Sequence, residues 1–408
     1  MRVARPLVSF LVFLAVALAI LGGMHAYLWL RLVRDTGLAE PWRRAATWSL
    51  VGGALLIPAG ILASRLSGLA LSRAVPLAAF VWLGLAFLLF AALLLTDAVR
   101  LAAFVTNQLG DWVRAVPDAP ADPARRQLLA RAVAGGALVV AGGAGALSLR
   151  SAAGPAEIEE VPVRLARLPR ALSGFSIAQV SDLHVGPTIR EREVRRVVEQ
   201  VNALRPDAIA ITGDLVDGST AELGGIIGLL GRLSAPQGVY FVTGNHEYYS
   251  GAEAWTAFLE RLGIRVLRNE RVALGDRGPG GATFDLAGLP DSSAGHRGSA
   301  AAMDLPAALA GRDPERSLVL LAHQPRLADL DAAVQAGVEL QLSGHTHGGQ
   351  LFPWSLAVRA AFPYVKGLHR HAAGAQAGQV YVHRGTGYWG PPMRLGAPPE
   401  ITRLVLTA

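Results

Sequence analysis

The sequence predicts an α/β domain preceded by a bundle of transmembrane helices. Three observations lead to this prediction. Apolar stretches of about 20 residues, the length that spans a bilayer, recur before residue 150. From about Val163, short apolar runs alternate with amphipathic segments, as they do in α/β domains. Each of the five strand-like runs there is followed within a few residues by a side chain that can ligate a metal ion.

Composition narrows the class of protein. The chain has 408 residues, enough for one large domain and a further region. Hydrophobic residues make up 52% and charged residues only 17%, which is too apolar for an ordinary soluble protein. The net charge of +7 comes mainly from scattered arginines, so we expect no nucleic-acid partner. Cysteine is absent, which excludes disulfides and thiolate metal sites.

The apolar excess is concentrated in residues 1–150, where we predict a transmembrane region of four helices. These cover 7–30, 47–66, 74–97 and 128–149. Buried core helices are the alternative, but no polar face recurs at the helical period. A linker over 151–162 then leads into a domain over 163–408.

Arginines near the ends of the predicted spans are divided unevenly between the two sides of the membrane. Nine lie on the side of loop 31–46 and five on the other side. The richer side should be cytoplasmic, which makes the chain a multi-pass protein of the cell membrane with its domain 163–408 outside the cytoplasm. Arg125 and Arg126, before the fourth span, also resemble a twin-arginine export signal, with ordinary flanking charge as the alternative.

The second half contains the predicted strands 176–181, 208–212, 239–243, 317–322 and 338–342. After the first of them, valines recur at helical spacing from Val194 to Val201, and Pro206 marks the end of that helix. The strands are followed by Asp182-Leu183-His184, Gly213-Asp214, Gly244-Asn245-His246-Glu247, His323-Gln324-Pro325 and Gly344-His345-Thr346-His347-Gly348-Gly349-Gln350. Side chains at the carboxyl ends of strands converge at one edge of a sheet, so we expect them to form one site.

The last of these stretches carries two histidines separated by one residue. In an extended backbone, His345 and His347 point the same way and can face one ion or two adjacent ions. The flanking glycines permit positive φ and a close approach of a ligand to the main chain. Two surface histidines in a polar turn are the alternative for this stretch alone. The ordered set, with gaps of 32, 31, 78 and 22 residues from Asp182 through Asp214, Asn245 and His323 to His345, favours metal ligation.

This ordered set resembles the calcineurin-like metallophosphoesterases, in which Asp-X-His, Gly-Asp, Gly-Asn-His, a lone His and Gly-His-X-His follow one another. More narrowly, it is similar to the membrane-anchored or exported branch of YkuE- and YaeI-like phosphodiesterases. That narrower resemblance is carried by Ser181–Gly186, Gly348–Gln350, Arg384–Gly387 and Pro391–Arg394. The resemblance covers about residues 160–408 and implies a four-layer α/β/β/α sandwich of two mixed sheets.

The resemblance also implies a role for each site residue. One divalent metal ion would be held by Asp182, His184, Asp214 and His347. A second ion would be bridged by Asp214 and held by Asn245, His323 and His345. His246 would act as a general acid on the leaving group or stabilise the phosphoryl oxygens, and a structural histidine is the alternative. Ligands of nitrogen and oxygen suit Mn²⁺, Fe²⁺ or Zn²⁺, and Asp217 and Glu247 are expected to orient them.

The function predicted from these features is that of a membrane-anchored, two-metal phosphoesterase cleaving a phosphodiester or pyrophosphate. Residues 351–366 combine aromatic, aliphatic and basic side chains and read as an interfacial wall for a lipid-linked substrate, UDP-diacylglucosamine- or phospholipid-like. A core-packing segment is the alternative reading of that stretch. Alternative functions are a phosphatase acting on soluble nucleotides or phosphoproteins, and a non-catalytic membrane scaffold or receptor. The complete ligand set argues against the scaffold, because a binding-only module needs no bridged pair of ions.

Overall fold

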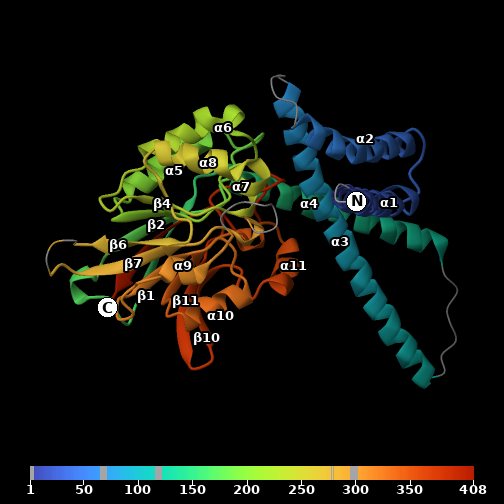
Figure 1. Cartoon of the computed structure of the whole chain (residues 1–408). Coiled ribbons are helices and arrows are strands. Elements are labelled where there is room, and N and C mark those ends of the chain that lie inside the picture. The colour runs from blue at the N-terminus through green and yellow to red at the C-terminus, as the bar shows by residue number, and fades with distance from the viewer. Residues whose placement is uncertain (1–3, 65–70, 115–121, 277, 279, 295–301) are drawn as a thin grey trace. The chain divides into compact units, whose positions relative to one another are not determined.

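The computed structural model describes residues 4–64, 71–114, 122–276, 278, 280–294 and 302–408 (Figure 1). Its contacts divide the chain into two compact units, Met1–Leu147 and Ser148–Ala408.

The first unit is helical. It contains α1 (Ala4–Trp29), a π-helical turn η1 (Leu30–Arg34), α2 (Trp42–Ala63), α3 (Leu71–Arg114) and most of α4 (Pro123–Ala153). Among the described residues, four helices are long and apolar enough to cross a membrane, and each of them contains most of one predicted span. Residues 65 and 66 of the second predicted span lie outside the described residues. Helix α3 continues well beyond the predicted end at residue 97, because Val99 to Val105 extends its apolar run.

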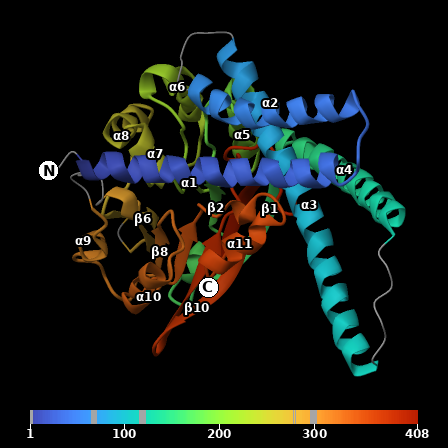
Figure 2. The same cartoon turned by 90° about the vertical axis from the view of Figure 1, so that its right-hand side faces the viewer.

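Small residues bring α2 and α3 close together. A Cβ atom added at Gly60 would lie 2.2 Å from the Cβ of Ala79, so the two backbones approach as glycine allows. Two polar side chains between α1 and α3, those of His25 and Trp82, form hydrogen bonds. The indole nitrogen of Trp82 donates to Nε2 of His25 at 3.0 Å, and Nδ1 of the same histidine bonds to the carbonyl of Leu21 at 2.8 Å. Figure 2 shows α1 running beside α2.

The second unit is built on two mixed sheets. In its described part, the first sheet has the order β1-β12-β2-β3-β4-β5 and the second the order β10-β11-β9-β8-β7-β6. The first contains β1 (Glu157–Arg164), β2 (Ser176–Val180), β3 (Ala208–Ile211), β4 (Val239–Phe241), β5 (Arg265–Val266) and β12 (Glu400–Thr407). The second contains β6 (Glu270–Gly275), β7 (Thr283–Gly288), β8 (Leu318–Leu321), β9 (Leu340–Ser343), β10 (Gly367–Ala373) and β11 (Gln376–Val382).

Parallel pairing places several strand ends together. Strands β2 to β5 pair in parallel, and β7, β8, β9 and β11 do the same in the second sheet. Two antiparallel hairpins, β6–β7 and β10–β11, complete the second sheet. Strand β12 lies between β1 and β2, parallel to the first and antiparallel to the second.

The sheets pack face to face and helices cover their outer faces (Figure 1). The pleat of β2 divides its residues, since Ile177 joins the core between the sheets while Ala178 and Val180 pack beneath helices. Those helices are α5 (Glu191–Ala203), α6 (Thr220–Ile227) and α8 (Ala252–Arg261). Helices α9 (Leu305–Leu309) and α10 (Leu327–Gln335) cover the second sheet. The four-layer α/β/β/α sandwich expected from the resemblance is confirmed.

The linker predicted over 151–162 is mostly regular structure. Helix α4 continues to Ala153, and β1 begins at Glu157 and pairs with β12 along its length. Strand β1 stands at the edge of the first sheet. Proline, which lacks a backbone N–H, is tolerated in edge strands, and β1 contains Pro162. A strand whose partner lies about 240 residues further along the chain has no local sequence signal beyond its own alternation.

Candidate metal centre

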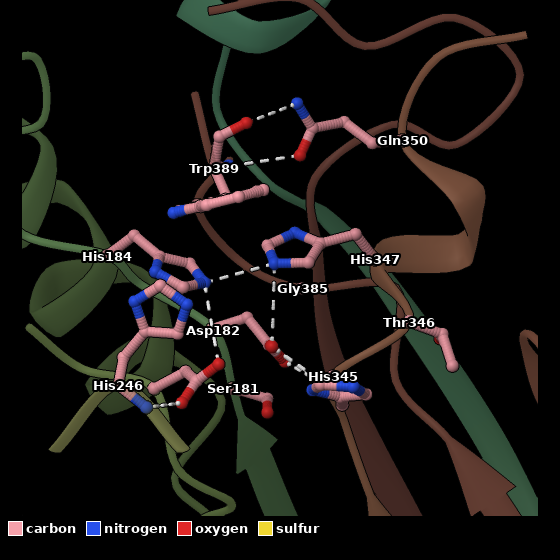
Figure 3. A network of polar contacts seen from close by, with 12 residues as sticks. Ser181, Asp182, His184, His246, His345, Thr346, His347, Gln350, Gly385 and Trp389 are labelled. Carbon is pink, nitrogen blue, oxygen red and sulfur yellow. Dashed lines mark hydrogen bonds and ion pairs between the residues drawn. The ribbon is translucent and has the colours of Figure 1, made fainter. Parts of the chain in front are cut away.

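The seven predicted ligands come together where strands of both sheets end. Asp182 and His184 follow β2, Asp214 follows β3, and Asn245 begins α7 (Asn245–Ser250) directly after β4. From the second sheet, His323 follows β8, while His345 and His347 follow β9. Figure 3 shows Asp182, His184, His345 and His347 meeting in one network of polar contacts, with His246 beside them. The carboxyl ends of parallel strands thus form one site, as the spacing predicts.

The backbone at this site is held in an uncommon conformation. Positive φ values occur at Asp182 (54°), His184 (48°), Asp214 (53°), His345 (69°) and His347 (51°). Residues other than glycine adopt the left-handed region only where the surrounding structure imposes it, and such residues concentrate at functional sites. Crowding explains why position 344 of the histidine motif is a glycine. A Cβ at Gly344 would lie 2.0 Å from the Ser181 hydroxyl and 2.3 Å from a carboxylate oxygen of Asp182.

The first group of facing ligand atoms belongs to Asp182, His184 and His347, all within 4.8 Å of one another. Nε2 of His184 lies 3.0 Å from Nε2 of His347, and that nitrogen is 3.5 Å from Oδ1 of Asp182. Asp217 accepts from Nδ1 of His184 at 3.3 Å, and Nε2 of the same ring faces His347. Asp182, His184 and His347 would together hold one metal ion.

The second group consists of Asp214, His323 and His345. Nδ1 of His323 donates to the carbonyl of Thr212 at 2.7 Å, which turns Nε2 towards Asp214. That Nε2 lies 3.1 Å from Oδ2 of Asp214 and 3.2 Å from the side-chain oxygen of Asn245. The same Oδ2 of Asp214 is 3.8 Å from Nε2 of His184 in the first group. One carboxylate therefore faces both groups.

Burial makes the electrostatics of the site strong. Asp182, His184, Asp214 and His323 are all buried. Burial lowers the pKa of the His184 imidazole, but the neighbouring Asp217, Asp214 and Asp182 outweigh it and raise that pKa to about 9. Burial would raise the pKa of Asp214, yet His323 and His184 hold it well below its usual range. Burial together with His323 lowers the pKa of His345 to about 4.

These residues fit a pair of divalent metal ions. The donor set consists of carboxylate, amide and imidazole groups, which suit Mn²⁺, Fe²⁺ or Zn²⁺. Hydrogen bonds on the opposite ring nitrogen already orient Nε2 of His184 and Nε2 of His323 towards Asp214. Buried carboxylates at this density require compensating positive charge, which bound cations would supply.

His246 lies beside the first group. Its ring nitrogen Nδ1 is 2.5 Å from Oδ1 of Asp217, and its backbone N–H donates to Oδ1 of Asp214 at 2.8 Å. The ring meets His184 edge to face at 4.5 Å between centroids. Asp217 thus orients both His184 and His246 through the same oxygen, in line with the orienting role expected of it.

Glu247 is a buried carboxylate that accepts three backbone hydrogen bonds. Oε2 accepts from the N–H groups of Gly244 at 2.6 Å and Asp214 at 3.0 Å, and Oε1 accepts from Leu215 at 2.7 Å. It ties the turn that carries Asp214 to the turn before Asn245. Burial and the nearby Asp214 raise the pKa of Glu247 to about 7, against the lowering effect of the backbone donors.

Gln350, Trp389 and Arg394 contact the site from segments that are distant in the sequence. The side-chain amide of Gln350 accepts from the Trp389 N–H at 3.0 Å and donates to the Trp389 carbonyl at 2.9 Å (Figure 3). The Trp389 ring stands 5.6 Å from the His246 ring. Arg394 is buried and donates to the carbonyls of His347 and Arg384. Gln350 and Arg394 belong to stretches that carry the family resemblance, whereas nothing in the sequence singles out Trp389.

Comparison with known proteins agrees with this fold and site. Residues 175–349 match the family of calcineurin-like phosphoesterases. A zebrafish (Danio rerio) protein called transmembrane protein with metallophosphoesterase domain is 35% identical over 74% of this chain and 68% of its own length. The chain therefore belongs to the calcineurin-like metallophosphoesterases, a family that generally uses a binuclear metal centre.

Two further relatives extend the comparison. A Bos taurus protein with the same name as the zebrafish protein is 40% identical over 64% of this chain and 60% of its own length, so the chain spans less than two thirds of that relative. The uncharacterized metallophosphoesterase YkuE of Bacillus subtilis is 31% identical over 69% of this chain and 97% of its own length.

Proposed function

We propose that this protein is a membrane-anchored phosphoesterase that uses two divalent metal ions to hydrolyse a phosphodiester or pyrophosphate. One observation carries the proposal: Oδ2 of Asp214 lies 3.8 Å from Nε2 of His184 and 3.1 Å from Nε2 of His323. A carboxylate can bridge two cations, whereas an imidazole nitrogen binds one. The arrangement supports a bridged pair of ions rather than two independent sites.

The ligands divide between the ions as the contacts suggest. Asp182, His184 and His347 would hold one ion with Asp214, and Asn245, His323 and His345 would complete the other. When bound, such a pair of ions clamps the phosphate, acidifies a water and stabilises the charge of an in-line attack. Asp217 keeps the rings of His184 and His246 in place from the opposite side.

His246 is the group of this chain suited to the leaving oxygen. With Nδ1 held by Asp217, its Nε2 is the ring atom left to give a proton to that oxygen or to bond a phosphoryl oxygen. The exposed rings of Trp389 and Tyr249 flank it at centroid distances of 5.6 and 5.2 Å. They form an aromatic wall beside the expected position of the leaving group, which would suit a leaving group with an apolar or aromatic part.

The test uses the full chain purified in detergent, with bis(p-nitrophenyl) phosphate as substrate and bound metal measured by mass spectrometry. The wild type should bind two ions per chain and turn over only when loaded. Asp214→Asn should lower the occupancy of both ions and abolish turnover. Two ions bound to Asp214→Asn with near-normal activity would refute the bridge. A loaded wild type without any hydrolysis of phosphodiesters or pyrophosphates would instead favour a scaffold.

The proposal includes a lipid-linked substrate. Helix α11 (Trp354–Ala361) begins five residues after the last glycine of the histidine motif and has no buried residue. Phe352, Trp354 and Leu356 are 51%, 57% and 58% exposed, which contradicts the core-packing alternative for these side chains. An exposed row of apolar side chains next to the metal centre is suited to an interface or to acyl chains.

A pair of substrates tests this part of the proposal. Phe352→Ser with Leu356→Ser should lower kcat/KM for a long-chain phosphodiester in mixed micelles by roughly tenfold, the loss of two apolar contacts, and leave bis(p-nitrophenyl) phosphate unaffected. Leu327→Ser is the matched control, because Leu327 is 53% exposed but lies at the start of α10. Equal losses on both substrates, or the same loss in the control, would count against a lipid-linked substrate.

The catalytic unit is proposed to lie outside the cytoplasm of a multi-pass protein in the cell membrane. The excess of arginines on the side of loop 31–46 supports this orientation. A phosphatase reporter that requires export should be active when fused after Ala408 and silent when inserted in loop 31–46. The reverse pattern would put the catalytic unit in the cytoplasm.

A further inference from the structure

A cavity of about 860 Å³ lies within the helical unit, and four of its lining residues are arginines. Its charged walls are Arg31 and Arg34 from η1, Arg100 from α3 and Arg126 from α4, and Asp35 is the only carboxylate among the described residues that line it. Pro123, Ala124, Leu129 and Ala130 form an apolar side on α4. The cavity therefore combines an excess of guanidinium groups with one apolar wall.

One side of the cavity is a rigid ion-pair network. Arg31 donates to Asp35 at 2.6 Å and to Asp97 at 2.7 Å, and the Tyr27 hydroxyl donates to Asp97 at 2.6 Å. Asp35 also accepts from Arg34. Helix α4 is joined to the segment after η1 by Arg131, whose Nε donates to the carbonyl of Thr36 at 2.8 Å. The charge of Arg31 is thus already neutralised, and its side chain serves to shape the cavity.

Arg100 and Arg126 are less well compensated than Arg31 and Arg34. Arg100 lies 3.8 Å from Asp97, which already pairs with Arg31 and Tyr27. Arg126 has no ion-pair partner among the residues that the structure describes. Its neighbour Arg125 is not part of the lining. The guanidinium groups of Arg100 on α3 and Arg126 on α4 therefore line one cavity with positive charge that is not fully neutralised.

The location of the cavity restricts its ligand. Arg31 and Arg34 end the first candidate membrane span, while Arg126 lies at the start of the fourth. Two spans separate loop 31–46 from the segment before α4, so these arginines lie on one side of the membrane whichever side that is. At the polar boundary of a bilayer, an unpaired guanidinium is stabilised by phosphate, which accepts its parallel N–H groups two at a time.

We propose that this cavity is a binding site for the phosphate group of an anionic ester, with Arg100 and Arg126 as its ligands. The apolar wall on α4 suits the glycerol and upper acyl carbons of a phospholipid, while a soluble phosphate ester would use the arginines alone. The site lies in the helical unit and does not depend on the metal centre or on its activity.

The test measures lipid binding to the full chain, delipidated in a nonionic detergent, by native mass spectrometry. Phosphatidylglycerol should bind more tightly than phosphatidylcholine. Arg126→Gln should weaken phosphatidylglycerol binding roughly tenfold, and Arg100→Gln with Arg126→Gln roughly a hundredfold, as expected for the loss of charge-assisted hydrogen bonds. Arg125→Gln is the matched control, since it removes the same charge from the adjacent residue outside the cavity.

Competition by inorganic phosphate and glycerol 1-phosphate identifies the source of the ester. Displacement of the lipid by either compound supports the site with a soluble ligand. Resistance to both, with binding that still requires Arg126, supports the site with a phospholipid. Equal weakening by Arg125→Gln and Arg126→Gln, or no preference for phosphatidylglycerol over phosphatidylcholine, would overturn the proposal. Arg126 is exposed on α4, so its single variant should remain folded if the double variant does not.

Discussion

Replacing Glu247 by glutamine should destabilise the catalytic unit far more than its small change in shape suggests. The two carboxylate oxygens accept from three buried backbone N–H groups, those of Gly244, Asp214 and Leu215. Glutamine offers one oxygen and one NH₂ group in the same space. If the oxygen keeps the bonds to Gly244 and Asp214, the NH₂ group faces the N–H of Leu215, donor against donor. The opposite orientation leaves two donors without an acceptor.

The magnitude follows from the better of these two orientations. It loses one hydrogen bond to a charged group and leaves a buried donor unsatisfied on each side, at about 1–3 kcal/mol for each such loss. We expect a destabilisation of about 2–5 kcal/mol, a large part of the roughly 5–15 kcal/mol that stabilises a typical domain. For a unit of this size, that corresponds to a fall in Tm of roughly 4–20 °C.

Thermal unfolding of the full chain in detergent, followed by scanning fluorimetry, measures this shift. Glu191→Gln is the control, because Glu191 is an exposed glutamate on α5 whose pair with Arg195 should contribute only about 0.3–0.5 kcal/mol. A Tm for Glu247→Gln as close to wild type as that of Glu191→Gln would refute the reasoning. It would show that Glu247 is protonated in the folded protein, since glutamine mimics a neutral carboxyl group.

Three other predictions concern catalysis and metal binding. His246→Asn should keep both ions but lower kcat by roughly 10²–10⁴-fold, less for substrates with good leaving groups, and loss of metal instead would make His246 a ligand. Asp217→Asn should cost roughly 10–100-fold in metal affinity or activity, while Asp331→Asn, which removes a 2.8 Å contact to His371 away from the site, should cost neither. Metal affinity of the free protein should rise at least tenfold from pH 7 to pH 8 in a titration, because the pKa of His184 is raised to about 9, that of His323 is raised well above its usual range, and their protons must leave before the rings ligate. A flat profile would show that the His184 imidazole is already neutral.

Local patterns in the sequence predicted the central part of the fold. The five predicted strands appear as β2, β3, β4, β8 and β9, because buried parallel strands are short apolar runs that need no information about their neighbours. Strands β1 and β12 escaped the prediction, since they are stabilised by pairing with each other across the whole second unit. The hairpins β6–β7 and β10–β11 were not predicted, since the family resemblance implied only a second mixed sheet and not its strands.

The candidate site shows the same division between local and distant information. Residue types and strand endings were enough to predict that His184, Asp214 and His323 would meet. They could not predict that one oxygen of Asp217 contacts two histidine rings, or that Gln350 holds the backbone of Trp389. Such contacts depend on loop conformations and on segments 29–39 residues apart, and neither leaves a periodic signal.

The place of β12 in the first sheet determines when the site can form during synthesis. Residues 400–407 fill the position between β1 and β2, and Asp182 and His184 stand directly after β2. A nascent chain that has already released all seven candidate ligands still lacks the strand that joins β1 to the rest of the sheet. We expect the metal centre to form only after β12 has been translated. Chains that end before residue 400 should therefore be inactive, although they contain all seven candidate ligands.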